Sequence, residues 1–162
     1  MPHKLTTSSP VVFQKQTSLQ ILLAGLCSGL AISAVVTLSQ FANQPLLLGS
    51  FGGSCFLLFG FPRAVFSQPR NLIIGHILCS LIGLIFLKYL GSEWWSMGLA
   101  VTTAVVLMLA SQTLHPPAVS NAIIVFLTPS DWQFLWYPTI AGIALLLVLS
   151  RILLRLTTKV AI

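Results

Sequence analysis

The stretch Ser111-Gln112-Thr113-Leu114-His115-Pro116-Pro117-Ala118-Val119-Ser120-Asn121 separates two apolar segments in a chain that is apolar almost throughout. Its adjacent prolines interrupt any helix, because proline lacks a backbone N–H and restricts the residue before it. In a membrane, the backbone groups freed by such an interruption need partners within the protein or in a water-filled cavity. The stretch therefore predicts a broken crossing at the centre of a membrane protein.

The overall composition agrees with a membrane-embedded chain. Of the 162 residues, 56% are hydrophobic and 6% are charged, whereas soluble domains carry about 25% charged residues. The net charge is +6, and the basic residues lie at segment ends, where membrane topology and anionic lipid account for them. We therefore expect an integral membrane protein with the lipid bilayer as its partner and no nucleic acid.

Apolar segments of two lengths follow one another along the chain. A polar N-terminal arm, 1–18, is expected to precede a transmembrane domain over 19–157. Four segments are long enough to cross a hydrocarbon core of about 30 Å, and two are short and interrupted by Gly or Pro. The expected long helices are 19–38, 71–90, 94–110 and 137–156, and the short segments are 46–61 and 118–127. The predicted fold class is an all-α membrane protein.

The segment 118–127 is too short to cross the membrane as a helix. Its helical length would be about 15 Å, which is half of the hydrocarbon core. An extended 112–117 would add about 20 Å. Helix and extended segment together would just cross, which makes the stretch around His115 half of a crossing.

Two topologies remain open. In the first, both short segments are re-entrant and four helices span the membrane. In the second, all six elements cross. With six crossings and a cytoplasmic N-terminus, every Lys and Arg except Lys88 lies inside, and all four tryptophans lie near the outer surface. The positive-inside bias favours six crossings.

A short internal repeat points to two similar halves. Ser39–Pro45 matches Ser111–Pro117 at three of seven positions. Each copy follows a long helix and precedes a short segment, which gives halves of about 19–90 and 94–157. Three crossings in each half would place the halves in opposite orientations, as in many transporters with inverted repeats.

The residues offer little for enzyme chemistry. The chain has two carboxylates, Glu93 and Asp131, both in expected interfacial loops, and no acid pair, metal-ligand cluster or phosphate-binding loop. We therefore expect no catalytic residue, no metal and no cofactor. The three cysteines fall in apolar runs and are expected to be small buried residues.

The short segments favour binding of an anion. Helix N-termini after Pro45 and Pro117 carry partial positive charge and free N–H donors. Side chains that can donate hydrogen bonds lie between them, namely Ser50, Ser54, Ser120 and Asn121, and no membrane-embedded acid is expected to attract a cation. Arg63 and Arg70 can concentrate anions at the inner mouth. The candidate substrate pathway consists of Gly49, Ser50, Gly52, His115, Pro116, Pro117, Ser120 and Asn121.

Structural roles compete with these functional ones. His115 is either a helix cap or a titratable donor at a constriction. His76 is better explained as a structural group bonded to a neighbouring carbonyl. The glycines of 49–53 either allow close helix packing or line a pore.

The residues also resemble a known family. His115-Pro116-Pro117-Ala118 resembles the signature of the HPP family of membrane proteins. Pro45–Gly52 and Gln68-Pro69-Arg70-Asn71, with Gly75-His76 after it, are similar to two further blocks of that family in the same order. The resemblance implies four spanning helices and movement of nitrite across cyanobacterial or chloroplast envelope membranes. We place Gln68, Arg70, Asn71 and His76 at the inner mouth or in a secondary role.

The chain departs from the family at two positions. Members commonly carry Gly and Ala where this chain has Val119 and Ser120, and the larger side chain at 119 narrows that spot. The short N-terminal arm favours the plasma membrane of a bacterium, with a cyanobacterium as one candidate, over a chloroplast. We expect a homo-oligomeric facilitator of small monovalent anions, nitrite first among them. The alternative is a non-transporting membrane scaffold.

Overall fold

The computed structural model describes residues 16–158. Most of the expected N-terminal arm, together with Lys4, Lys15 and Lys159, lies outside that range. Within it the fold is all-helical, without a strand, as the sequence predicts. The helices are α1 (Ser18–Ala42), α2 (Ser50–Gly60), α3 (Pro69–Leu90), α4 (Trp94–Ala110), α5 (Val119–Leu127) and α6 (Ala141–Thr158), with short 3₁₀ segments η1 (Val65–Ser67) and η2 (Pro116–Ala118) and a π-helical segment η3 (Leu135–Ile140).

Three helical stretches in the described range are long and apolar enough to cross a membrane. They are Ser18–Ala42, Pro69–Leu90 and Leu135–Thr157. The fourth expected span, α4, has the predicted bounds, but its 17 residues make it shorter than these three. The two segments expected to be short are short: α2 has 11 residues and α5 has nine.

The break before α5 is more compact than predicted. The length estimate took 112–117 as extended, but Pro116–Ala118 forms a 3₁₀ turn in which Ala118 N donates to His115 O at 3.0 Å. The physical reason is that the proline ring fixes φ near the helical value, so adjacent prolines suit the first turn of a helix. Only the residues around Thr113 to His115 remain without helical structure.

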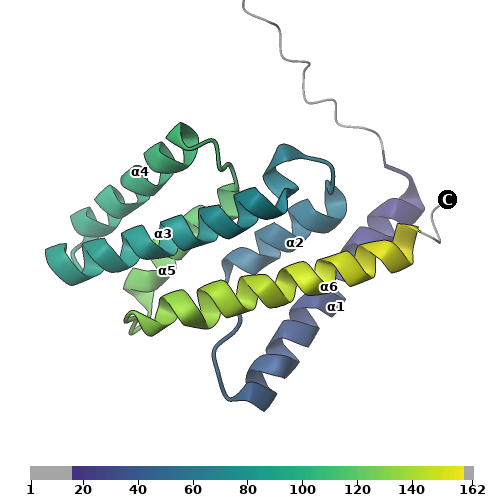
Figure 1. Ribbon diagram of the computed structural model, residues 1–162, viewed down its shortest axis with the longest axis horizontal. Helices are drawn as coiled ribbons and strands as arrows, with labels where there is room; N and C mark the ends of the chain where they lie inside the picture. The colour runs from purple at the N-terminus through teal and green to yellow at the C-terminus, as the bar shows by residue number, and fades with distance from the viewer. Residues whose placement is uncertain (1–15, 159–162) are drawn as a thin grey trace, which may run out of the picture.

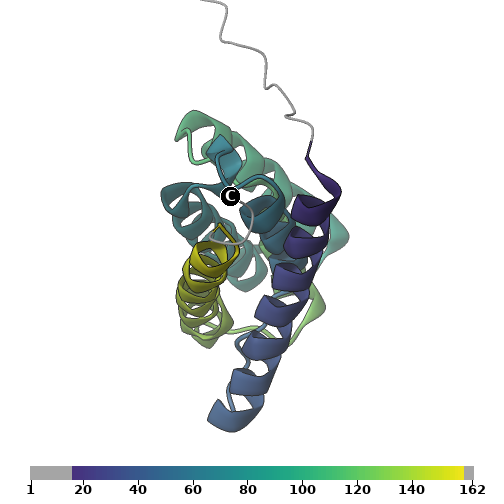
Figure 2. The same ribbon diagram turned by 90° about the vertical axis from the view of Figure 1, so that its right-hand side faces the viewer.

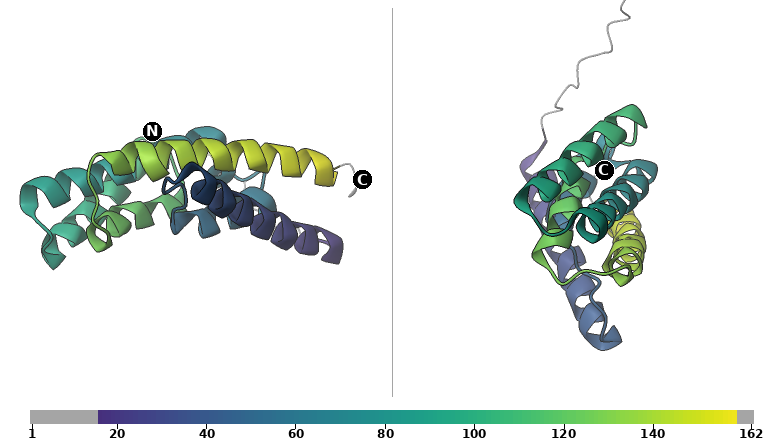
Figure 3. Two further views of the ribbon diagram at one scale, coloured as in Figure 1. Left: turned by 90° about the horizontal axis from the view of Figure 1, so that it is seen from below. Right: turned by 90° about the vertical axis from the view of Figure 1, so that its left-hand side faces the viewer.

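The short helices α2 and α5 lie between α4 at one end of the bundle and α1 at the other (Figures 1 and 3). α1 and α4 lie at opposite ends of the bundle, and Figure 2 shows α1 running obliquely along one edge. α1 packs on α2 and α6, whereas α4 packs on α3 and α5. The most extensive packing is between α3 and α5, so the segment after the proline break is held against the central long helix.

Two glycines permit the closest helix contacts. A Cβ at Gly83 on α3 would lie 3.1 Å from Ala122 Cα and 3.2 Å from its carbonyl oxygen on α5. A Cβ at Gly142 on α6 would collide with the carbonyl oxygen of Leu46, at the entry to α2. Small residues at such crossings are what allow membrane helices to approach backbone to backbone.

Polar and apolar side chains are distributed as a lipid-facing protein requires. Large apolar side chains are exposed around the outside of the bundle, as on α1 and α4. Every Lys, Arg, Asp and Glu in residues 16–158 is exposed. The cysteines are buried, as predicted: Cys27, Cys55 and Cys79.

Candidate functional site

A cluster of uncharged polar side chains is buried where the short helices meet α3. Each member is at most 3% exposed. We call this set the polar centre; its members are Ser50 and Ser54 of α2, His76 and Ser80 of α3, His115 of the break, Asn121 of α5 and Thr139 of η3. Buried polar groups cost free energy unless they are hydrogen-bonded, so their partners decide what the cluster can do.

His115, in the proline break, makes hydrogen-bond contacts with two residues from the first half of the chain. Its Nδ1 lies 2.6 Å from the carbonyl oxygen of Phe66, in the loop between α2 and α3. Its Nε2 lies 2.9 Å from Ser54 Oγ. The side chain therefore bridges a loop carbonyl and a helix hydroxyl.

His76 lies beside His115, with ring centroids 5.0 Å apart. Its Nδ1 lies 2.9 Å from the carbonyl oxygen of Leu72, one turn earlier on α3. This is the bond to a neighbouring carbonyl that the structural interpretation predicts. Its Nε2 also faces two hydroxyls, Ser50 Oγ at 3.2 Å and Ser54 Oγ at 3.5 Å, so the ring belongs to the polar centre as well.

Asn121 connects both short helices to the middle of α3. Ser50 Oγ donates to Asn121 Oδ1 at 2.7 Å, and Asn121 Nδ2 donates to Ser80 Oγ at 3.0 Å. Ser80 Oγ in turn lies 2.9 Å from Thr139 Oγ1. The polar centre is thus one continuous hydrogen-bonded chain that runs from the α2–α3 loop to η3.

No buried hydrogen-bonding side chain of the described residues is left without a partner. Across residues 16–158, each buried side-chain nitrogen and oxygen has a hydrogen-bond partner. In a low-dielectric interior such a network holds its members rigidly. Any further group could bind there only by replacing bonds that already exist.

The structure brings together five residues singled out in the sequence: Ser50, Ser54, His76, His115 and Asn121. Two members of the polar centre were not singled out, Ser80 and Thr139. For Ser80 a signal existed, because it follows His76 by four residues, which is the spacing of one helix face.

Other predicted pathway residues lie outside the polar centre. Gly49 and Gly52 are exposed, and a Cβ at Gly52 would have no atom within 4 Å. Pro116 is exposed, whereas Pro117 packs against Gly53, where a Cβ would lie 3.1 Å from its ring. Ser120 Oγ donates to the Pro117 carbonyl at 2.7 Å. These residues shape the break and do not touch the network.

Three residues predicted for the inner mouth lie at the start of α3: Gln68 immediately precedes the helix, and Arg70 and Asn71 belong to its first turn. Gln68 and Arg70 are exposed. Asn71 is buried and donates from Nδ2 to the Val65 carbonyl at 2.8 Å, which fixes the turn that presents the Phe66 carbonyl. Val119, where the chain departs from the family, packs on the apolar cluster around Cys79.

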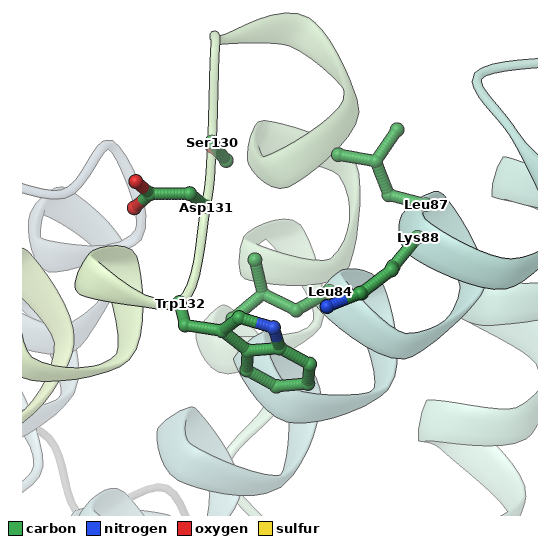
Figure 4. Close-up of a pocket in the computed structure, with 6 residues that line it drawn as sticks. All are labelled: Leu84, Leu87, Lys88, Ser130, Asp131 and Trp132. Atoms are coloured by element: carbon green, nitrogen blue, oxygen red, sulfur yellow. The ribbon is translucent and has the colours of Figure 1, made fainter.

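A pocket of about 280 Å³ opens at the other end of α3 (Figure 4). Lys88 Nζ lies 5.5 Å from the centre of the Trp132 ring, within the range of a cation–π contact. In Figure 4 the Asp131 carboxylate points away from Lys88. The pocket is lined by Leu84, Leu87, Lys88, Ser130, Asp131 and Trp132.

Comparison with known proteins gives two curated relatives, both from Dictyostelium discoideum and both named only as transmembrane proteins. One is 32% identical over 122 residues, which cover 70% of this chain and 42% of the relative. The other is 36% identical over 96 residues, which cover 56% of this chain and 31% of the relative. The chain therefore spans less than half the length of either relative. No solved structure matches it.

The family comparison covers nearly the whole chain. Residues 13–161 match the family described as HPP, transmembrane region. The match includes the proline break, every helix of the described range and the complete polar centre. The resemblance based on His115-Pro116-Pro117-Ala118 is confirmed, and the chain is an integral membrane protein of the HPP family.

Proposed function

We propose that this protein carries a small monovalent anion across the membrane through the polar centre, with nitrite as the first candidate. The observation that carries this proposal is the continuous hydrogen-bonded chain from His115 to Thr139, buried where two short helices interrupt an otherwise apolar bundle. Polar side chains inside a membrane are costly and are typical of substrate pathways. Hydroxyl, amide and imidazole groups suit an anion that accepts hydrogen bonds.

The pathway is proposed to follow one side of α3. His76, Ser80, Leu84 and Lys88 are spaced four residues apart, and residues at this spacing lie on one face of a helix. Lys88 lines the pocket at one end, and the polar centre occupies the middle. Leu84, which is 3% exposed, lies between them as an apolar barrier. The pocket would collect the anion before it passes this barrier.

The contact between Lys88 and Trp132 supports six crossings. With four crossings, the end of α3 and the loop before η3 would lie on opposite sides of the membrane. Their side chains instead line one pocket. Six crossings put both on the outer side, and we propose a cytoplasmic N-terminus in a bacterial plasma membrane, cyanobacterial membranes included, from the positive-inside bias.

Two observations support an inverted repeat. The last helix of each proposed half packs on the first helix of the other, α3 on α4 and α6 on α1. Both first helices are followed by a residue in the left-handed region, Asn43 with φ 49° and Gln112 with φ 56°. A twofold axis between the halves would produce both features, the reciprocal packing of first and last helices and the same backbone conformation after each first helix.

We further propose a non-enzymatic homo-oligomer. α1 exposes large apolar side chains, and around Gly25 and Gly29 a Cβ would meet nothing within 4 Å. A small-residue surface of this kind lets a second helix approach closely. Light scattering of the detergent-solubilised protein measures the number of chains.

A non-transporting scaffold is the second candidate, because a fully satisfied polar network also serves to fix helix positions. Uptake by liposomes that contain only this protein separates the two functions. We expect nitrite entry well above that of protein-free liposomes, with formate, nitrate and chloride as competitors. His115→Ala should reduce the flux while the protein still inserts and melts cooperatively. Flux equal to that of protein-free liposomes would favour the scaffold.

A further inference from the structure

We infer that the polar centre takes up one proton together with the anion, and that Asn121 turns its amide when the proton arrives. This inference rests on the proposed function and adds the coupling ion to it. Its basis is the count of hydrogen-bond donors and acceptors around His76 and His115, two imidazoles with ring centroids 5.0 Å apart.

The backbone fixes the tautomer of both rings. His76 Nδ1 faces the Leu72 carbonyl at 2.9 Å, and His115 Nδ1 faces the Phe66 carbonyl at 2.6 Å. A carbonyl oxygen can only accept, so each Nδ1 carries a proton and donates it. In the neutral rings each Nε2 is therefore an acceptor, and each needs a donor from a neighbouring side chain.

With Asn121 in the orientation of the structure, the neighbouring hydroxyls supply too few donors. Ser54 has one proton for three acceptors: His115 Nε2 at 2.9 Å, the Ser50 carbonyl at 3.1 Å and His76 Nε2 at 3.5 Å. Ser50 lies 3.2 Å from His76 Nε2 but donates to Asn121 Oδ1 at 2.7 Å. A neutral His76 would then face two oxygens whose protons are used elsewhere. A protonated His76 removes the conflict, because Nε2–H donates to Ser50 Oγ.

The neutral state requires a different arrangement of the same groups. Ser50 must then donate to His76. The Asn121 amide must flip about χ2, which exchanges the positions of Oδ1 and Nδ2. Nδ2 then donates to Ser50, Oδ1 accepts from Ser80, and Ser80 accepts from Thr139, using the contacts of 2.7, 3.0 and 2.9 Å. Each of these contacts is a hydrogen bond in both protonation states, and the two states differ in which group of each pair donates.

The proton also supplies what an anion requires. The neutral centre has no spare donor, and every Lys and Arg of residues 16–158 is exposed. The other buried titratable groups on the helices that pack there are the thiols of Cys55 and Cys79, and α4, α5, α6, η1, η2 and η3 contribute no buried acid or cation. A protonated imidazole provides both a positive charge and an N–H. Two charged rings this close repel, so the pair holds one proton.

Proteoliposomes with trapped pyranine, a pH-sensitive dye, test the coupling. Nitrite entry and internal acidification are measured together, with the membrane potential held at zero by equal K⁺ and valinomycin, and protein-free liposomes are subtracted. One proton per anion makes transport electroneutral, so each pH unit of inward gradient drives about tenfold accumulation. A potential that is positive inside should leave the rate unchanged.

The matched variants are His76→Gln and Thr102→Ala. Glutamine keeps a donor and an acceptor but takes up no proton, so we expect a tenfold or greater loss of gradient-driven nitrite entry. Thr102 is exposed on α4, where its hydroxyl donates to the Gly98 carbonyl, so Thr102→Ala should behave like the parent. Nitrite entry that follows the membrane potential without acidification would overturn the inference and leave the proposed function in place. No nitrite entry at all would overturn the function.

A spectroscopic measurement tests the proton without transport. In the detergent-solubilised protein with ¹⁵N-labelled histidine, His76 and His115 are assigned by His→Gln substitution. We expect Nδ1–H tautomers at high pH, and added nitrite should increase the doubly protonated fraction of one ring. Rings that keep a single tautomer over the whole range in which the protein is folded, with and without nitrite, would contradict the inference even if transport is absent.

Discussion

Ser50 and Asn121 join the two short helices of the bundle through one hydrogen bond of 2.7 Å, from Ser50 Oγ to Asn121 Oδ1. Ser50 is the first residue of α2, and Asn121 lies in the first turn of α5. Both side chains are buried. The N-terminal ends of the two short helices therefore meet, and each contributes one buried polar side chain to the contact.

Replacement of Asn121 by alanine should destabilise the fold. Ser50 and Ser80 would each lose a partner inside an apolar interior, and a buried polar group left unpaired costs about 1–3 kcal/mol. We expect a lower midpoint of thermal unfolding in detergent. Ser120→Ala is the control, since Ser120 is half-buried and bonds only within its own turn. Equal midpoints for both variants would mean that the Asn121 bonds contribute nothing to stability.

Gly83→Ala should weaken the packing of α3 on α5. The new methyl group would lie 3.1 Å from the backbone of Ala122, and such overpacking typically costs about 1–3 kcal/mol. The matched control is Gly98→Ala on α4, where a Cβ meets nothing within 4 Å. Alanine there should be neutral or stabilise the helix by about 1 kcal/mol. Unfolding by SDS compares the two, and a Gly83 variant as stable as the Gly98 variant would show that the helices can separate freely.

Leu84→Ala should speed anion entry if the pathway follows α3. The substitution removes the buried side chain between Ser80 and the pocket that Lys88 lines. We expect a faster initial rate of nitrite uptake into liposomes, despite some loss of stability from the cavity. Leu109→Ala, at an exposed position of α4, should leave the rate unchanged. A slower rate in the Leu84 variant alone would place the pathway elsewhere.

Lys88→Gln should reduce the rate of anion capture at low salt. The lysine charge attracts anions to the pocket, and salt screens this attraction within about 10 Å at 0.1 M. The difference from the parent should therefore shrink as the concentration of an impermeant salt rises. Arg151→Gln is the control, because Arg151 is exposed but does not line the pocket. A loss that does not depend on salt would indicate a role other than attraction of the anion.

Single cysteines introduced at Arg63, Ser92 and Ser130 decide the topology. Six crossings place 92 and 130 on one side of the membrane and 63 on the other, whereas four crossings place 63 and 130 together. We expect an impermeant maleimide to label positions 92 and 130 from the same side. The native thiols are buried, so we expect them to contribute little labelling. The parent protein without an introduced cysteine measures this background.

The order and kind of the elements could be read from the sequence, because apolar length and proline position are local properties. α4 has the predicted bounds, and α2 and α5 are the short segments. The 3₁₀ turn at Pro116 was missed, since an extended and a tightly wound proline pair look alike in the sequence. Boundaries elsewhere shift by a few residues, as at Ala42, where α1 continues past the predicted end.

The polar centre could be predicted only in part. His115 and Asn121 stood out because they follow a break, and His76 stood out as a histidine in an apolar helix. Ser80 and Thr139 did not, because a single hydroxyl in a long apolar helix is equally compatible with a bond to its own backbone, as Thr102 makes on α4. Which face of each helix meets the others depends on packing over the whole bundle, which no local pattern contains.

The bond between His115 and the Phe66 carbonyl has a consequence for how the protein is made. The polar centre draws Ser54, His76 and Ser80 from the part of the chain synthesised first, and His115 and Asn121 from the part synthesised last. A chain that ends before Ser111 contains Ser54, His76 and Ser80 without these partners. We therefore expect a nascent chain that stops before Ser111 to be recognised by membrane quality control and degraded, and the finished chain to become resistant only when α5 has docked.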